Sequence, residues 1–126
     1  MYHVDVFNLG EQAFKITSKD AEFVVDTKGK GITPPDALLA SLGSCIGVYI
    51  RKYAESSKLD LGNFSLTVDA ELSKDPPVAF QEIKVSLDLK GLVIDERRKK
   101  ALLDFVDNCP VHNTLRVYPR VEIKII

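Results

Sequence analysis

The segment 33-TPPDALLASLGSCIGVYIRKYAES-56 decides the fold, because it joins a helix start to a long apolar run. Thr33 can cap a helix whose first residue is Pro34. Asp36 stands three residues after Thr33, the position that a capping box gives to its second polar residue. The remaining residues are apolar almost all round, so we predict a helix that is fully buried. Cys45 lies in the middle of this helix.

Short strands precede and follow this predicted helix. The two alternating strands after it are expected to pair as a hairpin, and a second helix and a last strand follow. The expected elements are strands Tyr2–Phe7, Ala13–Ser18, Glu22–Thr27, Asn63–Ser73 and Ile83–Leu89, a helix over 96–108 capped by Asp95, a short turn or helix over 110–115, and a strand over 121–125. The order βββ-α-ββ-α-β is that of an α+β domain with antiparallel sheets and a buried central helix. We expect residues 1–126 to form one domain.

Composition excludes several classes of protein. The formal net charge is −1, and the basic residues are scattered except for a run over 97–100. That run lies on a predicted helix, where it reads as a solvated face, so we expect no nucleic-acid partner. The N-terminal residues show no export signal. The apolar run around Cys45 is shorter than the roughly 20 residues that cross a bilayer. We therefore expect a soluble, cytoplasmic protein without a membrane partner.

The two cysteines, Cys45 and Cys109, have different surroundings in the predicted elements. A reducing compartment disfavours a permanent disulfide, which leaves two separate thiols, a redox pair or metal ligands. Pro110 suits the first position of a short helix, so backbone N–H groups would favour a thiolate at Cys109. Cys45 lies some ten residues into its helix and would need a cation from elsewhere. From the pattern alone, Cys45 is interpreted as a core cysteine.

His112 and a pair of glycines leave alternatives open. The spacing Cys109-x-x-His112 could be half of a metal site, but too few further ligands are present, so we predict no metal. His112 could instead be a general base for Cys45, or a surface histidine in a turn. Gly43 and Gly47 form a ridge of small residues where another backbone can approach closely. The approaching element would be the domain's own sheet or a second helix across a twofold axis.

The pairing of 34-PPDALLASLGSC-45 with 109-CPVHNTL-115 resembles the OsmC/Ohr family of osmotically inducible and organic-hydroperoxide-resistance proteins. The order of elements also matches that family, so the resemblance covers nearly the whole chain. It implies an OsmC-like fold and an intertwined homodimer with two active sites at the interface. In such a dimer, the ridge of Gly43 and Gly47 would lie at the interface.

The resemblance also implies a thiol-dependent peroxidase that reduces organic hydroperoxides to alcohols. Cys45 would attack the peroxide and become a sulfenic acid, and Cys109 would condense with it to a disulfide. An external dithiol, usually a dihydrolipoyl protein in this family, would reduce the disulfide, and no cofactor is required. The alternative is a non-enzymatic OsmC-like dimer that senses oxidant or binds a small apolar or electrophilic ligand at the interface cleft.

Family members support the first cysteine with an N-terminal arginine and with a glutamate just before the helix. The first arginine here is Arg51, and helical periodicity of about 100° per residue points it away from Cys45. The nearest acid to the glutamate position is Asp36, and His112 follows the second motif, so both are candidate supporting residues. The lysines that could replace the arginine are Lys15, Lys19, Lys28 and Lys30.

Overall fold

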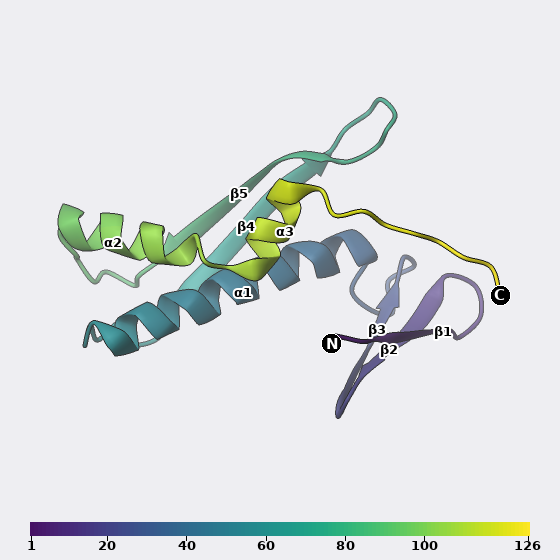
Figure 1. The fold of residues 1–126 in the computed structure, drawn as a ribbon, viewed down its shortest axis with the longest axis horizontal. Helices are drawn as coiled ribbons and strands as arrows, with labels where there is room; N and C mark the ends of the chain where they lie inside the picture. Colours follow the sequence, from purple (N-terminus) through teal and green to yellow (C-terminus); the bar gives the residue numbers. More distant parts are fainter. The chain divides into compact units, whose positions relative to one another are not determined.

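The computed structural model describes all 126 residues and divides into two compact units, Met1–Ala40 and Ser41–Ile126. The elements follow in the order βββ-α-ββ-αα (Figure 1). Helix α1 (Pro34–Ser56) contains the boundary between the two units. The α+β class is confirmed, whereas the predicted order differs at its end, where a third helix is present and the last strand is not.

The first unit contains a three-stranded antiparallel sheet in the order β1-β2-β3. Ser18 pairs with Ala21 across a tight turn, in which Lys19 adopts a positive φ of 39°. The strands are β1 (Asp5–Asn8), β2 (Ala13–Ser18) and β3 (Ala21–Asp26). The middle strand has the predicted bounds, and the other two differ from the prediction by one to three residues. Large apolar side chains are exposed on this sheet, namely Val6, Phe7, Phe23 and Val24.

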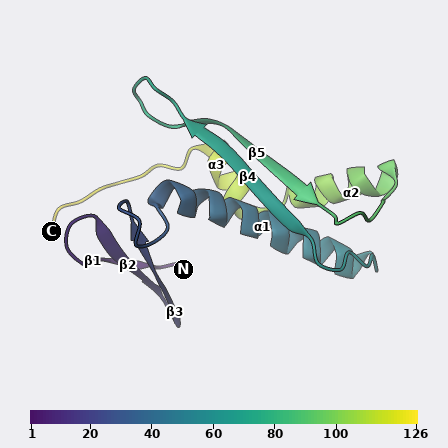
Figure 2. The ribbon, with the colours of Figure 1, turned by 180° about the vertical axis from the view of Figure 1, so that it is seen from behind.

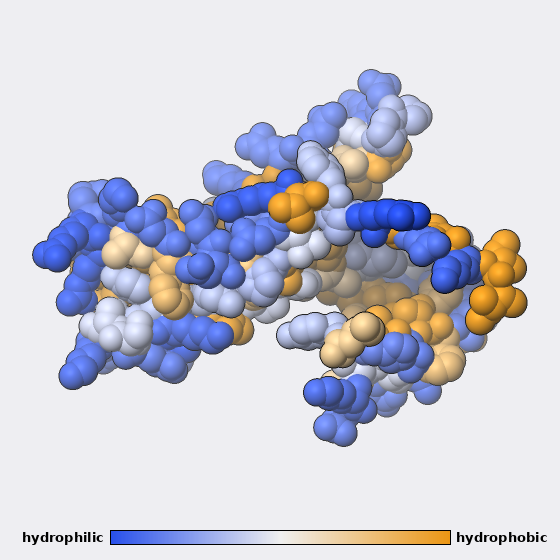
Figure 3. All heavy atoms as spheres, in the orientation of Figure 1, coloured by the Kyte–Doolittle hydropathy of each residue, from blue (hydrophilic) through white to orange (hydrophobic).

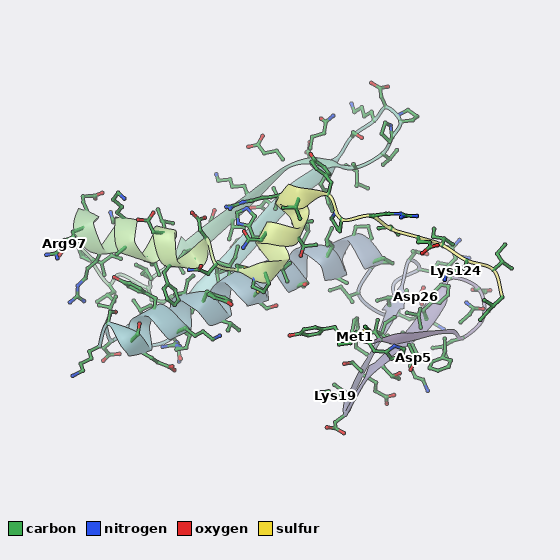
Figure 4. The ribbon with its side chains drawn as sticks, viewed as in Figure 1. Met1, Asp5, Lys19, Asp26, Arg97 and Lys124 are labelled. Atoms are coloured by element: carbon green, nitrogen blue, oxygen red, sulfur yellow. The ribbon has the colours of Figure 1, made fainter.

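The start of α1 forms as the sequence predicts. The Thr33 hydroxyl accepts a hydrogen bond from the backbone N–H of Asp36 (3.3 Å) and donates one to the Asp36 carboxylate (2.8 Å). Just before it, the buried carboxylate of Asp26 accepts the backbone N–H of Lys28 at 2.8 Å. Asp26 is labelled at the end of β3 in Figure 4. These bonds satisfy N–H groups that would otherwise lack partners, so the turn and the helix end are both fixed.

The second unit is built around one face of α1. Its hairpin pairs Val68 with Val85, and the two strands run alongside α1 in both ribbon views (Figures 1 and 2). The remaining elements are β4 (Ser65–Leu72), β5 (Phe80–Asp88), α2 (Glu96–Val106) and α3 (Pro110–Val117). The buried core is Leu42, Ile46, Ile50, Ala54, Leu61, Ile94, Leu102 and Cys109. Four of these residues follow each other at intervals of four along α1, which is the spacing of a single helix face.

Helix α1 is not buried all round, contrary to the sequence-based expectation. Leu38 and Val48 are 41% and 51% exposed in this chain. We expected full burial because the helix is apolar on every side. In the second unit, however, only the face that carries Ile46 and Ile50 is packed in the core. The uncovered face is therefore apolar surface that a second molecule could bury.

The ridge of Gly43 and Gly47 packs on the chain's own hairpin. A Cβ atom added to Gly43 would lie 2.8 Å from Cγ2 of Val68, and one added to Gly47 would lie 3.2 Å from Cδ1 of Leu66. Of the two alternatives left open by the sequence, the close approach of the domain's own sheet is correct. The placement of this ridge at a dimer interface is wrong, because β4 already occupies its surface.

The basic run over 97–100 lies on the exposed side of α2, which ends at Val106 rather than at 108. Lys99 pairs with Glu96 and Lys100 pairs with Asp104 on the same helix. Figure 4 labels Arg97 at the outer end of α2. Asp95 caps this helix as predicted, accepting the Arg98 N–H at 2.8 Å. None of the helices is both long and apolar enough to cross a membrane.

The predicted strand over 121–125 is absent. Residues 118–126 form no strand, and their apolar side chains, including Val121 and Ile123, are 78% or more exposed. A strand is held by backbone hydrogen bonds to a neighbouring strand, and no strand of this chain pairs with the segment. Figure 3 shows apolar surface at this end of the chain and on the first unit's sheet. Apolar and polar residues alternate over 121–125 as in a strand, but no neighbouring strand pairs with this segment.

The contact between Gly43 and Val68 yields the first prediction. Gly43→Ala should lower the free energy of unfolding by about 1 kcal/mol, because overpacking costs about 1–3 kcal/mol and the gain in helix propensity offsets up to about 1. Gly47→Ala is the matched control, since its neighbour is the mobile end of a leucine, and it should raise stability by up to about 0.5 kcal/mol. Urea unfolding of the reduced proteins measures both. Equal stabilisation by the two substitutions would contradict the close contact between Gly43 and Val68.

Candidate functional site

Cys45 is a free, half-buried thiol on α1. It lies one residue before Ile46 of the core and packs at the edge of that core. Its side chain is therefore neither fully buried nor fully exposed. The interpretation of Cys45 as a cysteine that fills space beside the core stays open, because the residue packs against the buried cluster.

Cys109 lies between α2 and α3 and is fully buried, with 0% of its surface exposed. It is the N-cap residue of α3, and Pro110 occupies the first helical position, as the sequence predicts. Its backbone N–H donates to the carbonyl of Val106 (3.0 Å), and its carbonyl accepts the N–H of Asn113 (3.0 Å). Both ends of its peptide are thus held by helices, which fixes the direction of the side chain.

The fold brings the two cysteine side chains to within 3 Å of each other, and both are free thiols. Burial is the main cause that raises the pKa of Cys109, and its hydrogen bond to Cys45 and the charge of a Cys45 thiolate raise it further. The backbone N–H groups of His112 and Val111 act in the opposite direction but do not prevail. The net effect is a raised pKa for Cys109, which favours the protonated form of its thiol.

The N–H groups of Val111 and His112 face Cys109 without closing a full capping hydrogen bond to its sulfur. They are the orphan donors of the first turn of α3, the group that attracts negative charge at a helix start. The position of Pro110 in the sequence predicted that these N–H groups favour a thiolate at Cys109. The sequence did not predict that burial outweighs them in setting the pKa, because the burial of Cys109 depends on α1 and its core.

A group of aromatic side chains connects α1 with α2. Tyr49 follows Cys45 by one helical turn, and its ring lies 6.0 Å from that of Phe105 on α2. Tyr53, one turn further, lies 5.9 Å from the same ring. The two tyrosines were not singled out from the sequence. The signal that could have found them is their spacing of four and eight residues from Cys45.

The candidate supporting residues lie in different places. His112 is on α3, and its backbone N–H faces Cys109, while its ring contacts Arg116 at 3.4 Å. Asp36 belongs to the first unit, where its carboxylate is engaged by Thr33 in the cap of α1. A role for either residue in chemistry stays a prediction.

Arg51 is engaged away from the thiols, in agreement with helical periodicity. It donates to the carbonyl of Gly62 at 2.7 Å, and its guanidinium lies 4.9 Å from the centre of the Phe64 ring. The four candidate lysines belong to the first unit, where Lys28 pairs with Glu11. That one of these lysines serves Cys45 stays a prediction. No group of three or more His, Cys, Asp or Glu side chains gathers closely enough to hold a metal ion.

Comparisons with known proteins agree with this architecture. A family model described as OsmC-like protein matches residues 27–124. A Psychrobacter arcticus protein, described as an osmotic stress induced and detoxification response protein, superposes with a TM-score of 0.79 at 21% identity, covering 90% of this chain and 88% of that chain. An OsmC-like protein from Mycoplasma pneumoniae gives 0.79 at 22% identity, covering 93% and 88%.

An organic hydroperoxide resistance protein, OsmC, from Legionella pneumophila gives a TM-score of 0.64 at 22% identity and covers 93% of this chain and 91% of that chain. At such identities these structures support the fold alone. No curated protein matches the sequence of the chain. The fold and the pair of adjacent thiols define an α+β protein with a dithiol site. The chain belongs to the OsmC-like family, whose model matches most of its length.

The pair of thiols yields the second prediction, which concerns their titration. Both effects of Cys45 on Cys109 raise the pKa of Cys109, so Cys45→Ala should lower that pKa. Thiolate absorbance near 240 nm follows the titration. Because Cys45 raises the pKa of Cys109, the single thiol step of Cys45→Ala should come at lower pH than the final thiol step of the wild type. A single step at the same or higher pH would contradict the contact between the two sulfurs.

Proposed function

We propose that this protein is a thiol-dependent peroxidase that reduces organic hydroperoxides to alcohols. The observation that carries the proposal is the pair of free thiols 3 Å apart, one half-buried and one fully buried. A thiol that attacks a peroxide must be reachable from outside, which suits Cys45. A thiol that resolves the product needs to reach only its partner, which suits Cys109.

The reaction has two steps before the protein is reduced again. The sulfur of Cys45 attacks the terminal oxygen of the hydroperoxide, the O–O bond breaks, and the alcohol leaves with a proton, so that Cys45 becomes a sulfenic acid. Cys109 then forms the S–S bond, the S–O bond breaks, and water leaves. The distance of 3 Å between the two cysteines supports this step, because the second thiol needs little movement to reach the first.

The surroundings of Cys45 favour an organic peroxide over hydrogen peroxide. Tyr49 follows Cys45 by one helical turn and presents aromatic surface, and both side chains pack against the same core. Such surface gains free energy by covering an alkyl or aryl group, at about 25 cal/mol per Å² of apolar area removed from water. Hydrogen peroxide has no group to place there.

An external dithiol completes the cycle, because the disulfide must be returned to two thiols and the proposed chemistry uses no cofactor. A dihydrolipoyl protein is the reductant that family resemblance favours. Such a cycle suits the cytoplasm, where the thiol pool is reducing.

We also propose that the protein acts as an intertwined homodimer. The segment 118–126 has the alternation of a strand but no strand partner, and apolar side chains of the first unit's sheet and of α1 are exposed. A sheet edge accepts an added strand through its unpaired backbone groups. A second copy of the chain would offer a sheet edge with which the segment 118–126 can pair, and apolar surface that can bury the exposed side chains.

A non-enzymatic dimer that senses oxidant or binds an electrophilic ligand is the second candidate. The observation that favours it is the position of Arg51, which is the first arginine of the chain and is held by Gly62 and Phe64. The guanidinium of Arg51 is thus not free to orient a peroxide as a bidentate donor. Turnover in the presence of a dithiol separates the two candidates. An enzyme consumes peroxide continuously, whereas a sensor is oxidised slowly and does not turn over.

The third prediction tests the reaction itself. One equivalent of an alkyl hydroperoxide should remove two hydrogen atoms from the intact reduced protein, as read by mass spectrometry. Cys45→Ser should consume no peroxide, whereas Cys109→Ser should stop at the sulfenic acid and proceed to sulfinic acid with excess peroxide. If the folded wild type stays unmodified while a denatured control oxidises, the peroxidase proposal fails.

The fourth prediction tests the dimer. Sedimentation should give twice the mass of one chain for the wild type and the mass of one chain for a variant that ends at Pro119. Ile123→Lys should raise the dimer dissociation constant by tenfold or more, because a charge replaces an apolar side chain on one face of the strand. Glu122→Lys alters the other face and serves as the matched control. A monomeric wild type, or a dimeric variant ending at Pro119, would contradict the proposal.

A further inference from the structure

The guanidinium of Arg116 joins the end of α2 to the body of α3. It donates to the carboxylate of Asp107 (3.0 Å), to the side-chain carbonyl of Asn113 (3.3 Å) and to Nδ1 of His112 (3.4 Å). Asp107 is the C-cap residue of α2, and the other two partners lie on α3. One side chain therefore spans the connection between the helices.

Cys109 lies inside the loop that this ion pair closes. Asp107 precedes it by two residues and Arg116 follows it by seven. Within the connection, Asn108 donates to the carbonyl of Phe105 through its backbone (3.1 Å) and through its side chain (2.9 Å). The sulfur itself makes no capping hydrogen bond. Besides its burial and its contact with Cys45, the position of the thiol depends on how firmly the two helices hold the chain on either side of it.

The placement of Asp107 needs this partner. A carboxylate at the C-terminal end of a helix faces the negative end of the helix dipole, which is unfavourable. Helix α2 has no basic residue in its last turn to offset that charge. Arg116, in the last turn of α3, supplies the cation and is itself favourably placed for its own helix.

The third contact of Arg116 is with the ring of His112, whose Nδ1 lies 3.4 Å from the guanidinium. The same residue directs its backbone N–H at the sulfur of Cys109. Arg116 therefore holds the residue whose backbone faces the buried thiol.

We propose that Arg116 is a positioning residue for disulfide formation, acting through Asp107 and α3 to keep Cys109 within reach of an oxidised Cys45. The inference rests on the proposed function and deepens it. The step that it serves forms the S–S bond and breaks the S–O bond of the sulfenic acid, and the proton of Cys109 and the hydroxyl group leave as water. Without rapid closure, a second hydroperoxide would convert the sulfenic acid to a sulfinic acid.

The expected effect is modest, because Arg116 and Asp107 are 46% and 60% exposed. An exposed ion pair of this kind changes an equilibrium or a rate by a factor of roughly two to five. Arg116→Ala should therefore slow disulfide formation about two- to fivefold in a single turnover and raise the sulfinic fraction at a given peroxide concentration by a similar factor. The rate at which Cys45 consumes the first peroxide should not change.

Arg97→Ala is the matched control, since it removes the same side chain from the outer end of α2 (Figure 4) and should leave both steps unchanged. Arg116→Lys should rescue in part, because lysine keeps the charge but not the planar fork. Asp107→Ala should slow disulfide formation as much as Arg116→Ala does, and the double variant should be no slower than either single variant. A general loss of stability would instead make the two effects add. The proposal would be overturned if Arg116→Ala formed the disulfide at the wild-type rate. It would also be overturned if the effects of Arg116→Ala and Asp107→Ala added up in the double variant, or if Arg116→Ala slowed the reaction with peroxide as much as disulfide formation.

A measurement without peroxide separates this inference from the proposed function. In a buffer of oxidised and reduced glutathione, two thiols of the protein form the disulfide while one oxidised glutathione becomes two reduced molecules. Arg116→Ala should lower the equilibrium constant for that disulfide two- to fivefold relative to the wild type and to Arg97→Ala. An unchanged constant overturns the positioning role even if the peroxidase is active. A lowered constant supports it even if peroxide does not react.

Discussion

The packing of one face of α1 against its hairpin and α2 is the interaction on which the site depends. Leu42, Ile46 and Ile50 bury that face, and two glycines let β4 approach it closely. Each fully buried side chain of this size contributes about 1.5–3 kcal/mol, which outweighs the cost of glycine in a helix. The same packing sets Cys45 at the edge of the core and brings the α2–α3 connection, with Cys109, to within 3 Å of it.

Two opposing effects meet at Cys109. The first N–H groups of α3 favour a thiolate, whereas burial and the neighbouring sulfur favour the thiol. Burial prevails because desolvation acts on the whole charge, while a short helix offers partial charges from a few amides. The result is an asymmetric pair, in which Cys109 is fully buried with a raised pKa and Cys45 is half-buried. This asymmetry supports different roles for two chemically identical side chains.

The chain also carries surface that its own elements leave uncovered. The segment 118–126, the sheet of the first unit and the face of α1 with Val48 are apolar and exposed. Backbone groups and apolar area of this extent are usually satisfied by another molecule. The proposed dimer accounts for all three with one partner. It also explains why sequence reasoning expected burial and pairing that a single chain does not provide.

The sequence by itself determined the helices, their caps at Thr33 and Asp95, the hairpin, and a motif pair that resembles the OsmC/Ohr family, because local periodicity and capping leave direct traces in the order of residues. It did not determine what the ridge of Gly43 packs against, the burial that raises the pKa of Cys109, or the link from Arg116 to Asp107. Each of these depends on residues far apart in the chain. Only the tertiary structure decided them, because burial and contact are properties of packed elements and not of local pattern.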